Sequence, residues 1–216
     1  MILEIDNIEL NFNQKKILYG IYLKLETGKI IGLLGRNGSG KTSLLRILFG
    51  DLKPKYKTIR IDGIHQRTSL FSKGIIGYLP QYTLLPNKMR LKKAFDLYNI
   101  SWNNFVNLFE SFNIYEKFKI QELSSGERRI VETYLVLFSG KPIILLDEPF
   151  SFIAPIYVEK FKSLILEKKK ESAILVSDHF YKEIFDVSDT VYFLKNGISK
   201  IVLTKKELED LGYISM

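Results

Sequence analysis

The stretch that decides the fold is "KIIGLLGRNGSGKTSLLRILFG", residues 29–50. Its first part, residues 29–35, is apolar on both faces, which is typical of a central strand in a parallel sheet. Residues 35–42 then match the pattern G-x-x-x-x-G-K-[ST] in full, and a helical pattern from Lys41 to Phe49 ends at Gly50. A strand, a glycine-rich turn and a helix in this order leave free backbone N–H groups at the helix start, where they bind phosphate. The stretch therefore predicts a phosphate-binding loop.

This phosphate loop, residues 35–42, carries the groups that a bound nucleoside triphosphate needs. Its glycines let backbone N–H groups converge on the α- and β-phosphates, Lys41 reaches the β- and γ-phosphates, and the Thr42 hydroxyl ligates Mg²⁺. The residues predicted to bind the nucleotide here are Gly35, Arg36, Asn37, Gly38, Ser39, Gly40, Lys41, Thr42 and Ser43.

Two adjacent acids end a second doubly apolar strand, "PIILLDEP" at residues 142–149. Asp147 is predicted to join the Mg²⁺ shell, directly or through water, and Glu148 to polarise the attacking water as a general base. Helix capping is the alternative for two acids at a strand end. The phosphate loop upstream favours the interpretation as a catalytic metal site.

Strands and helices alternate along the rest of the chain, which predicts an α/β fold with a mostly parallel core sheet. Residues 1–27 alternate as half-buried antiparallel strands do, and Asn196-Gly197 marks the turn of a hairpin. The whole chain, residues 1–216, is predicted to be a single domain with an antiparallel β subdomain and a small helical subdomain at roughly residues 83–138. The remaining predicted elements are strands at residues 58–63, 74–80 and 172–179, and helices within residues 91–118, 124–138 and 157–169.

The composition is that of a folded protein of 216 residues with 46% hydrophobic residues and no cysteine. The absence of cysteine excludes disulfides and thiolate metal sites and fits a reducing compartment. No apolar run is long enough to span a bilayer, and the first ten residues do not read as a signal peptide, so we expect a cytosolic protein. The net charge of +8 would suit nucleic acid or an anionic surface. The lysines are spread along the chain, however, and the dense run at residues 167–172 is typical of a solvated helix end.

Together these motifs resemble the ATP-binding cassette (ABC) ATPases, and the resemblance covers nearly the whole chain. "LSSGERR", residues 123–129, is similar to the family signature, usually L-S-G-G-Q. The resemblance implies a P-loop NTPase fold that uses ATP and Mg²⁺, with two ATP molecules held between two head-to-tail subunits. Each ATP would lie between the phosphate loop of one subunit and the signature helix of the other, so Ser124, Ser125 and Gly126 would act in trans. This agrees with the chemistry, because phosphoryl transfer requires stabilisation of the charge on the γ-phosphate, and one phosphate loop does not supply all of it.

Three further residues stand where the family places site residues. Gln81, in "GYLPQ", matches the glutamine that would contact Mg²⁺ or water, and His179, in "LVSDHF", matches the histidine that contacts the γ-phosphate. Phe12 stands where the family stacks an aromatic ring on adenine. The alternative interpretation of Phe12 is that its ring belongs to the hydrophobic core, as a buried position of an alternating strand.

The chain departs from the family pattern at three places. Ser125 replaces the first signature glycine, which would matter if this position needs a positive φ. The segment from Gln81 to Ser124 is short for the helical subdomain, and Ala154 stands where the family's D-loop carries an aspartate. The phrases "GERRIVE", "DEPFSFIAPIYVEK" and "SDHF" are most similar to cassettes of the lipopolysaccharide-export and branched-chain amino-acid type.

The resemblance predicts a transport motor: an ATPase that forms a homodimer, or a heterodimer with another cassette, and drives a separate transmembrane permease from the inner face of the membrane. The alternatives are a nucleic-acid-linked ABC ATPase, suggested by the positive charge, and a degenerate regulatory subunit. Long coiled-coil insertions and a second cassette are absent from the sequence, so no nucleic-acid partner is expected. The apolar residues Leu84, Leu85, Met89 and Phe95 follow Gln81 and lie among basic residues. One interpretation is that they line a groove that binds a short helix of the permease. The alternative is that these four side chains form the core of the small subdomain.

Overall fold

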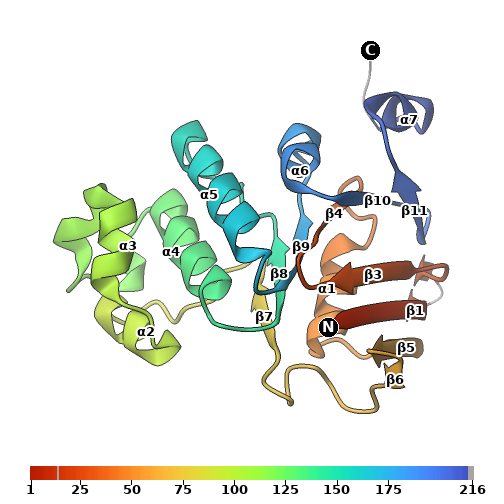
Figure 1. Cartoon of the computed structure of the whole chain (residues 1–216), viewed down its shortest axis with the longest axis horizontal. Helices are drawn as coiled ribbons and strands as arrows, with labels where there is room; N and C mark the ends of the chain where they lie inside the picture. Colours follow the sequence, from red (N-terminus) through yellow and green to blue (C-terminus); the bar gives the residue numbers. More distant parts are fainter. Residues whose placement is uncertain (14, 214–216) are drawn as a thin grey trace.

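The computed structural model describes residues 1–13 and 15–213, and its centre is a six-stranded sheet in the order β11-β10-β4-β9-β8-β7 (Figure 1). Neighbouring strands are parallel except β11, which forms the predicted hairpin with β10. Every residue of β4, β8 and β9 is buried, as their doubly apolar sequences predict. The bounds are β4 Ile30–Leu34, β7 Ile76–Leu79, β8 Ile143–Asp147, β9 Ala173–Ser177, β10 Thr190–Lys195 and β11 Ile198–Val202.

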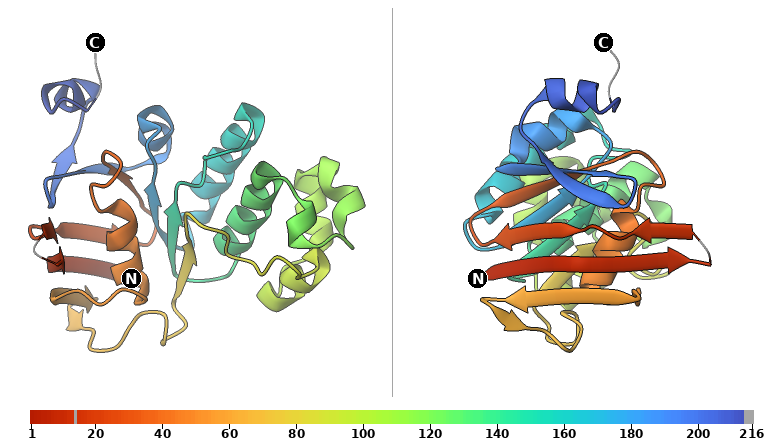
Figure 2. Two further views of the ribbon diagram at one scale, coloured as in Figure 1. Left: turned by 180° about the vertical axis from the view of Figure 1, so that it is seen from behind. Right: turned by 90° about the vertical axis from the view of Figure 1, so that its right-hand side faces the viewer.

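An antiparallel sheet of five strands forms the second layer, and Figure 2 shows it edge on and face on. Its long strand β1 pairs with β2, β3 and β5. Along β3 the side chains alternate between exposed and buried, which confirms the half-buried strands predicted for residues 1–27. The bounds are β1 Ile2–Phe12, β2 Lys15–Leu18, β3 Tyr22–Glu26, β5 Tyr56–Ile61 and β6 Ile64–His65.

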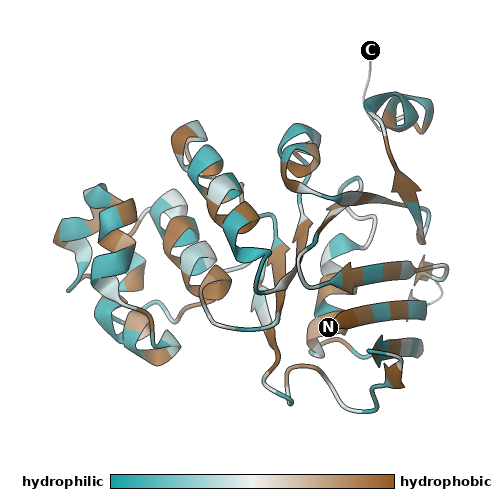
Figure 3. Ribbon diagram, in the orientation of Figure 1, coloured by the Kyte–Doolittle hydropathy of each residue, from teal (hydrophilic) through white to brown (hydrophobic). Residues whose placement is uncertain are grey.

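Helices cover both faces of the parallel sheet. Helix α1 (Lys41–Phe49) lies between the two sheets, where Leu44 and Leu48 pack into a core shared with β1, β3 and β4. Helices α4 (Ser125–Leu137), α5 (Pro155–Lys168) and α6 (Tyr181–Val187) cover the other face. Figure 3 shows the same division in hydropathy: the central strands are mostly hydrophobic, and the helices carry both hydrophobic and hydrophilic residues. The arrangement confirms the α/β fold with a mostly parallel core sheet and an antiparallel β layer.

The helical pattern of residues 91–118 folds as three short pieces: α2 (Leu91–Tyr98), α3 (Trp102–Leu108) and the 3₁₀ helix η1 (Glu110–Tyr115), with η2 (Ile120–Glu122) following. Helix α2 ends because Asn99 adopts a left-handed conformation, with φ 54°. Aromatic rings fill the space between the pieces, and the Trp102 ring meets Phe95 edge-on at a centroid distance of 5.0 Å. We propose that these pieces and α4 form the helical subdomain.

Two of the four side chains considered for a permease groove are core residues. Leu85 and Phe95 are buried, and Leu84 and Met89 are partly buried against the same cluster. The local-core alternative therefore holds for Leu85 and Phe95.

Several boundaries differ from the prediction. Helix α5 begins two residues before the expected start, because Pro155 occupies its first turn, where a missing N–H is harmless. Helices α6 and α7 (Lys205–Asp210) were not predicted, since elements of seven and six residues are too short to show a helical period. None of the helices in residues 1–13 and 15–213 has the length and apolarity that crossing a membrane requires.

Candidate functional site

A cleft of about 480 Å³ opens at the carboxyl ends of the parallel strands and brings most of the predicted site residues together. Four neighbouring strands each deliver one part of the site. The phosphate loop follows β4, and His179 follows β9. Asp147 ends β8 with Glu148 directly after it, and Gln81 follows β7. Because these strands are adjacent in the sheet, segments far apart in the sequence meet at one edge. The residues lining the cleft are Phe12, Ile17, Arg36, Asn37, Gly38, Ser39, Gly40, Lys41, Thr42, Ser43, Gln81 and Glu148.

The phosphate loop leaves its backbone donors available. Gly40 precedes α1 with a φ of 105°, a conformation that L side chains rarely adopt, and provides no side-chain cap for the first N–H groups of the helix. The buried Lys41 ammonium donates to the Gly35 carbonyl oxygen at 2.7 Å. Burial lowers the pKa of Lys41, although Glu148, Asp147 and Asp178 oppose that shift. A buried cation beside uncapped N–H groups suits a polyphosphate.

Asp147 is fully buried at the end of β8, next to the cleft residue Glu148. It accepts a hydrogen bond from the Ser177 hydroxyl at 2.5 Å. Burial raises the pKa of Asp147, and the Ser177 and Thr42 side chains oppose this shift. A carboxylate next to a threonine hydroxyl is an oxygen donor set of the kind Mg²⁺ uses when phosphates and waters complete its shell. The residues present therefore fit a magnesium ion.

Glu148 has a strained main chain and a well-placed side chain. Its φ is 55°, a left-handed conformation that costs about 1–3 kcal/mol for a residue other than glycine. Its carboxylate accepts from the Gln81 amide at 3.0 Å and lies 3.9 Å from the His179 Nδ1 atom. The structure thus places Gln81 and His179 beside the Glu148 carboxylate, and Gln81 and Glu148 line the cleft together with the phosphate loop.

Asp178 is a residue of the site that sequence analysis did not single out. It is fully buried, and its carboxylate accepts from the backbone N–H groups of His179 at 2.7 Å and Phe180 at 3.2 Å. Its Oδ1 atom lies 3.3 Å from the His179 Nδ1 atom, so the carboxylate and the imidazole ring are in contact. Burial raises the pKa of Asp178 to about 6, with these backbone donors opposing the shift. The signal was visible as the acid directly before the histidine in "SDH".

The signature residues do not line this cleft. Ser124 is the N-cap of α4: its hydroxyl accepts from the Glu127 N–H at 3.2 Å, and the Glu127 carboxylate accepts from the Ser124 N–H at 2.8 Å. Ser125 is the first helical residue and has a negative φ, so its position does not require glycine. Position 126, by contrast, requires glycine for a steric reason. A Cβ atom there would lie 2.5 Å from the carbonyl oxygen of Phe152, which belongs to the D-loop, residues 151–154.

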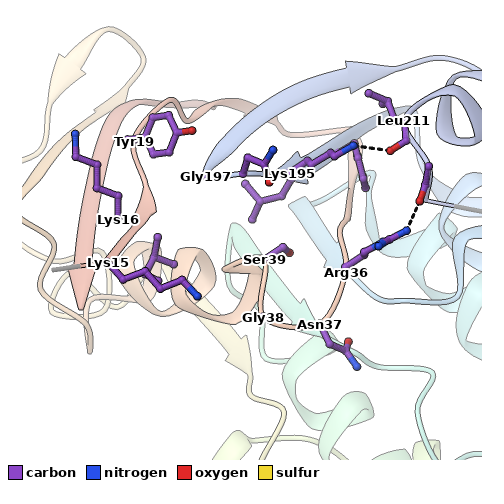
Figure 4. Close-up of a pocket in the computed structure, with 15 residues that line it drawn as sticks. Lys15, Lys16, Tyr19, Arg36, Asn37, Gly38, Ser39, Lys195, Gly197 and Leu211 are labelled. Atoms are coloured by element: carbon purple, nitrogen blue, oxygen red, sulfur yellow. Dashed lines mark hydrogen bonds between the residues drawn. The ribbon is translucent and has the colours of Figure 1, made fainter. Parts of the chain in front are cut away.

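Phe12 is 49% exposed and lines the cleft, so the alternative interpretation of Phe12 as a core residue is wrong. Arg36 lines this cleft too, and its guanidinium donates to the Gly212 carbonyl oxygen. Figure 4 shows this contact in a second cavity, of about 650 Å³, between the phosphate loop, the β10–β11 turn and the segment after α7. Lys195 binds the Leu211 carbonyl oxygen there at 2.7 Å, so two basic side chains hold this segment against the phosphate loop.

The amino-acid sequence is similar to those of known transport proteins. The family described as "ABC transporter" matches residues 18–151. The lipopolysaccharide export system ATP-binding protein LptB of Haemophilus influenzae is 33% identical over 222 residues, covering 94% of this chain and 90% of that protein. The arabinose import ATP-binding protein AraG of Mannheimia succiniciproducens is 31% identical over 214 residues, covering 90% of this chain and 42% of that protein.

Solved structures agree on the fold. The structure of an ATP-binding subunit of an ABC transporter superposes with a TM-score of 0.80 at 19% identity, covering 99% of this chain and 94% of that chain. A bacterial Atm1-family ABC exporter with ATP bound gives a TM-score of 0.83 at 20% identity, covering 97% of this chain and 40% of that chain. At these identities the likeness concerns the fold alone.

Proposed function

The chain belongs to the ABC transporter family, as an ATP-binding and ATP-hydrolysing subunit, and from that premise we propose how its residues divide the work. The observation that carries the proposal is the meeting of the phosphate loop, Gln81 and Glu148 in one cleft at adjacent strand ends. In this proposal ATP lies along the phosphate loop, with its adenine against Phe12 and its γ-phosphate toward Gln81 and His179.

Each side chain then has a chemical task. Lys41 and the free N–H groups of α1 neutralise the phosphates, and Glu148 accepts a proton from the water that attacks the γ-phosphorus. Thr42 and Asp147, with Gln81, would hold Mg²⁺, which when bound neutralises charge on the β- and γ-phosphate oxygens. His179 donates to the γ-phosphate from a position that Asp178 fixes.

The cleft of a single chain lacks the signature residues, and this supports a proposal about partners. We propose that two cassettes, either two copies or this chain with another, assemble head to tail. Ser124, Ser125 and Gly126 of one then cover the nucleotide bound by the other. A separate permease would bind the pair and hold it at the inner face of the membrane. The relative of this chain from H. influenzae is named for lipopolysaccharide export, so we propose export of a lipid-linked substrate as the closest candidate for the transported class.

The nucleic-acid-linked alternative is not favoured, because the curated relatives reported above are named as parts of transport systems. A degenerate, non-hydrolysing subunit is not favoured either, since the complete phosphate loop, Asp147 and Glu148 are all in place.

The test is Glu148→Gln, which keeps the size of the side chain and removes the base. We expect the purified variant to bind ATP as the wild type does and to turn it over about a hundredfold or more slowly, the range for losing a general base. Steady-state ATPase assays and equilibrium titration with ATP measure the two effects separately. Unchanged turnover would remove Glu148 from the mechanism.

A further inference from the structure

Arg129 is a buried arginine on helix α4 that hydrogen-bonds only to main-chain carbonyls within the described residues. Its guanidinium, 6% exposed, donates to the Pro80 oxygen at 2.7 Å and to the Glu148 oxygen at 2.9 and 3.2 Å, and it also binds the Asp147 oxygen. These carbonyls belong to the end of β8 and to the start of the Gln81 loop, residues 80–85. Arg129 therefore joins three segments: the signature helix, the two acids and the Gln81 loop.

The main chain at Glu148 is the part of the site that most needs support. A positive φ persists at a residue other than glycine only where surrounding contacts determine it. At Glu148 the N–H donates to the Ser177 carbonyl oxygen at 2.7 Å, and the carbonyl on the other side accepts two hydrogen bonds from Arg129. Both sides of the residue are thus held, one by β9 and the other by α4.

The same helix holds the far end of the Gln81 loop. Glu132, one turn after Arg129, is buried, and its carboxylate accepts from the Leu84 N–H at 2.9 Å and the Leu85 N–H at 3.0 Å. Helix α4 thereby fixes both ends of the loop that carries Gln81, whose amide binds the Glu148 carboxylate at 3.0 Å. A displacement of α4 therefore reaches Glu148 by two routes, through its main chain and through Gln81.

We propose that Arg129 is a positioning residue for catalysis, which holds Glu148 in its strained conformation and ties its carboxylate to the position of the signature helix. This rests on the proposed function, in which Glu148 is the general base and α4 meets the nucleotide of the partner cassette. Engagement of α4 by that nucleotide then adjusts the base in the same chain. The two ATP sites are then linked through helix α4, and Arg129 provides the direct connection to the main chain of Glu148.

The experiment compares Arg129→Lys with a matched control, Arg128→Lys, on the same helix. Lysine keeps the positive charge but cannot reach three carbonyls at once, whereas Arg128 donates to Thr83 and Ile120 and touches neither acid. We expect Arg129→Lys to lower the turnover number for ATP about tenfold or more, with KM and the ATP dissociation constant within about twofold of wild type. Arg128→Lys should leave all three within about twofold.

A second measurement separates positioning from general damage to the fold. In a Glu148→Gln background the base is gone, so adding Arg129→Lys should lower the residual single-turnover rate by less than about twofold. Arg129→Gln, which retains two donors without the charge, is tested alongside, and its turnover should fall as far as that of Arg129→Lys.

The outcomes distinguish the two proposals. If Glu148→Gln leaves turnover unchanged, the proposed mechanism fails. If Glu148→Gln is slow while Arg129→Lys retains full turnover, only the positioning role fails. The positioning role is also overturned if Arg129→Lys loses ATP binding in parallel with turnover, if its effect is equally large in the Glu148→Gln background, or if neither Arg129 variant folds.

Discussion

Helices α1 and α4 both begin at sites proposed to meet phosphate, yet the two helix starts are built differently. At α1 the N-cap is Gly40, which has no side chain to accept from the first N–H groups. At α4 the N-cap is Ser124, and its reciprocal hydrogen bonds with Glu127 form a capping box. The first helix start is therefore completed by its ligand. The second is already satisfied within the chain and needs a ligand less.

Charge follows the same division. A buried ammonium, Lys41, lies at the first helix start, and a carboxylate, Glu127, lies at the second. The Glu127 carboxylate also accepts from the Tyr115 hydroxyl at 2.8 Å. A negative group near the start of α4 stabilises that helix through its dipole. We therefore expect an isolated chain to bind ATP through the phosphate loop alone and the signature end to bind only when another cassette presents a nucleotide.

Lys41→Ala is the change with the largest expected effect. Charge-assisted hydrogen bonds contribute about 1.5–3 kcal/mol each, so losing those to two phosphates should weaken ATP binding about 100-fold or more. Equilibrium titration of the purified chain with a fluorescent ATP analogue measures this, with Ser124→Ala as the control that keeps wild-type affinity. Equal affinities for the two variants would break the contrast between the helix starts.

Gly126→Ala tests the second helix start by steric overlap. The added Cβ atom would lie 2.5 Å from the Phe152 carbonyl oxygen, so the D-loop must move. An overlap that costs about 1–3 kcal/mol in the assembled site corresponds to about a 5- to 150-fold loss of turnover. ATP binding by the isolated chain should be unaffected. Ser125→Gly is the matched control, expected to stay within a few-fold of wild type because Ser125 has a negative φ.

Ser124→Ala removes the cap of α4 and should lower the free energy of unfolding by about 1 kcal/mol. Urea denaturation measures this as a lower midpoint with an unchanged slope. The prediction distinguishes α4 from α1, which has no side-chain cap to lose. An unchanged midpoint would mean that the capping box contributes nothing to stability.

Ala154→Asp adds a capping side chain at a third helix start, that of α5, and has the smallest expected effect. Ala154 is the N-cap of α5 and makes no side-chain hydrogen bond, so an aspartate there should add about 0.5–1 kcal/mol of stability. We also expect it to raise turnover or cooperativity between ATP sites, because the D-loop carboxylate of the family is restored. ATPase rate against ATP concentration checks the second effect. A wild type with a Hill coefficient near two and a variant with the same curve would show that the missing carboxylate has no functional consequence.

The sequence predicted what local rules determine. The phosphate loop has a fixed spacing, the three buried strands are apolar on both faces, and Asn196-Gly197 is a strong turn signal, so these elements lie where they were expected. Asp178 and Arg129 were missed for one shared reason. The position of Asp178 directly before His179 marks it as a candidate, but the roles of both residues depend on which carbonyls and N–H groups surround them after folding. Sequence spacing does not encode those contacts. Helices α6 and α7 were not predicted because one or two amphipathic turns are too short to show the periodic pattern of apolar residues that identifies a helix.

The edge-on packing of Trp102 against Phe95 has a consequence for spectroscopy. Trp102 is the one tryptophan of the chain, and it lies in α3, away from the residues that line the nucleotide cleft. Its emission therefore reports the packing of the α2–α3 segment and is not quenched by direct contact with adenine in the cleft of its own chain. A change in that emission when ATP is added would mean that the segment has shifted against its neighbours, so the protein carries an intrinsic probe of motion at a distance from its chemistry.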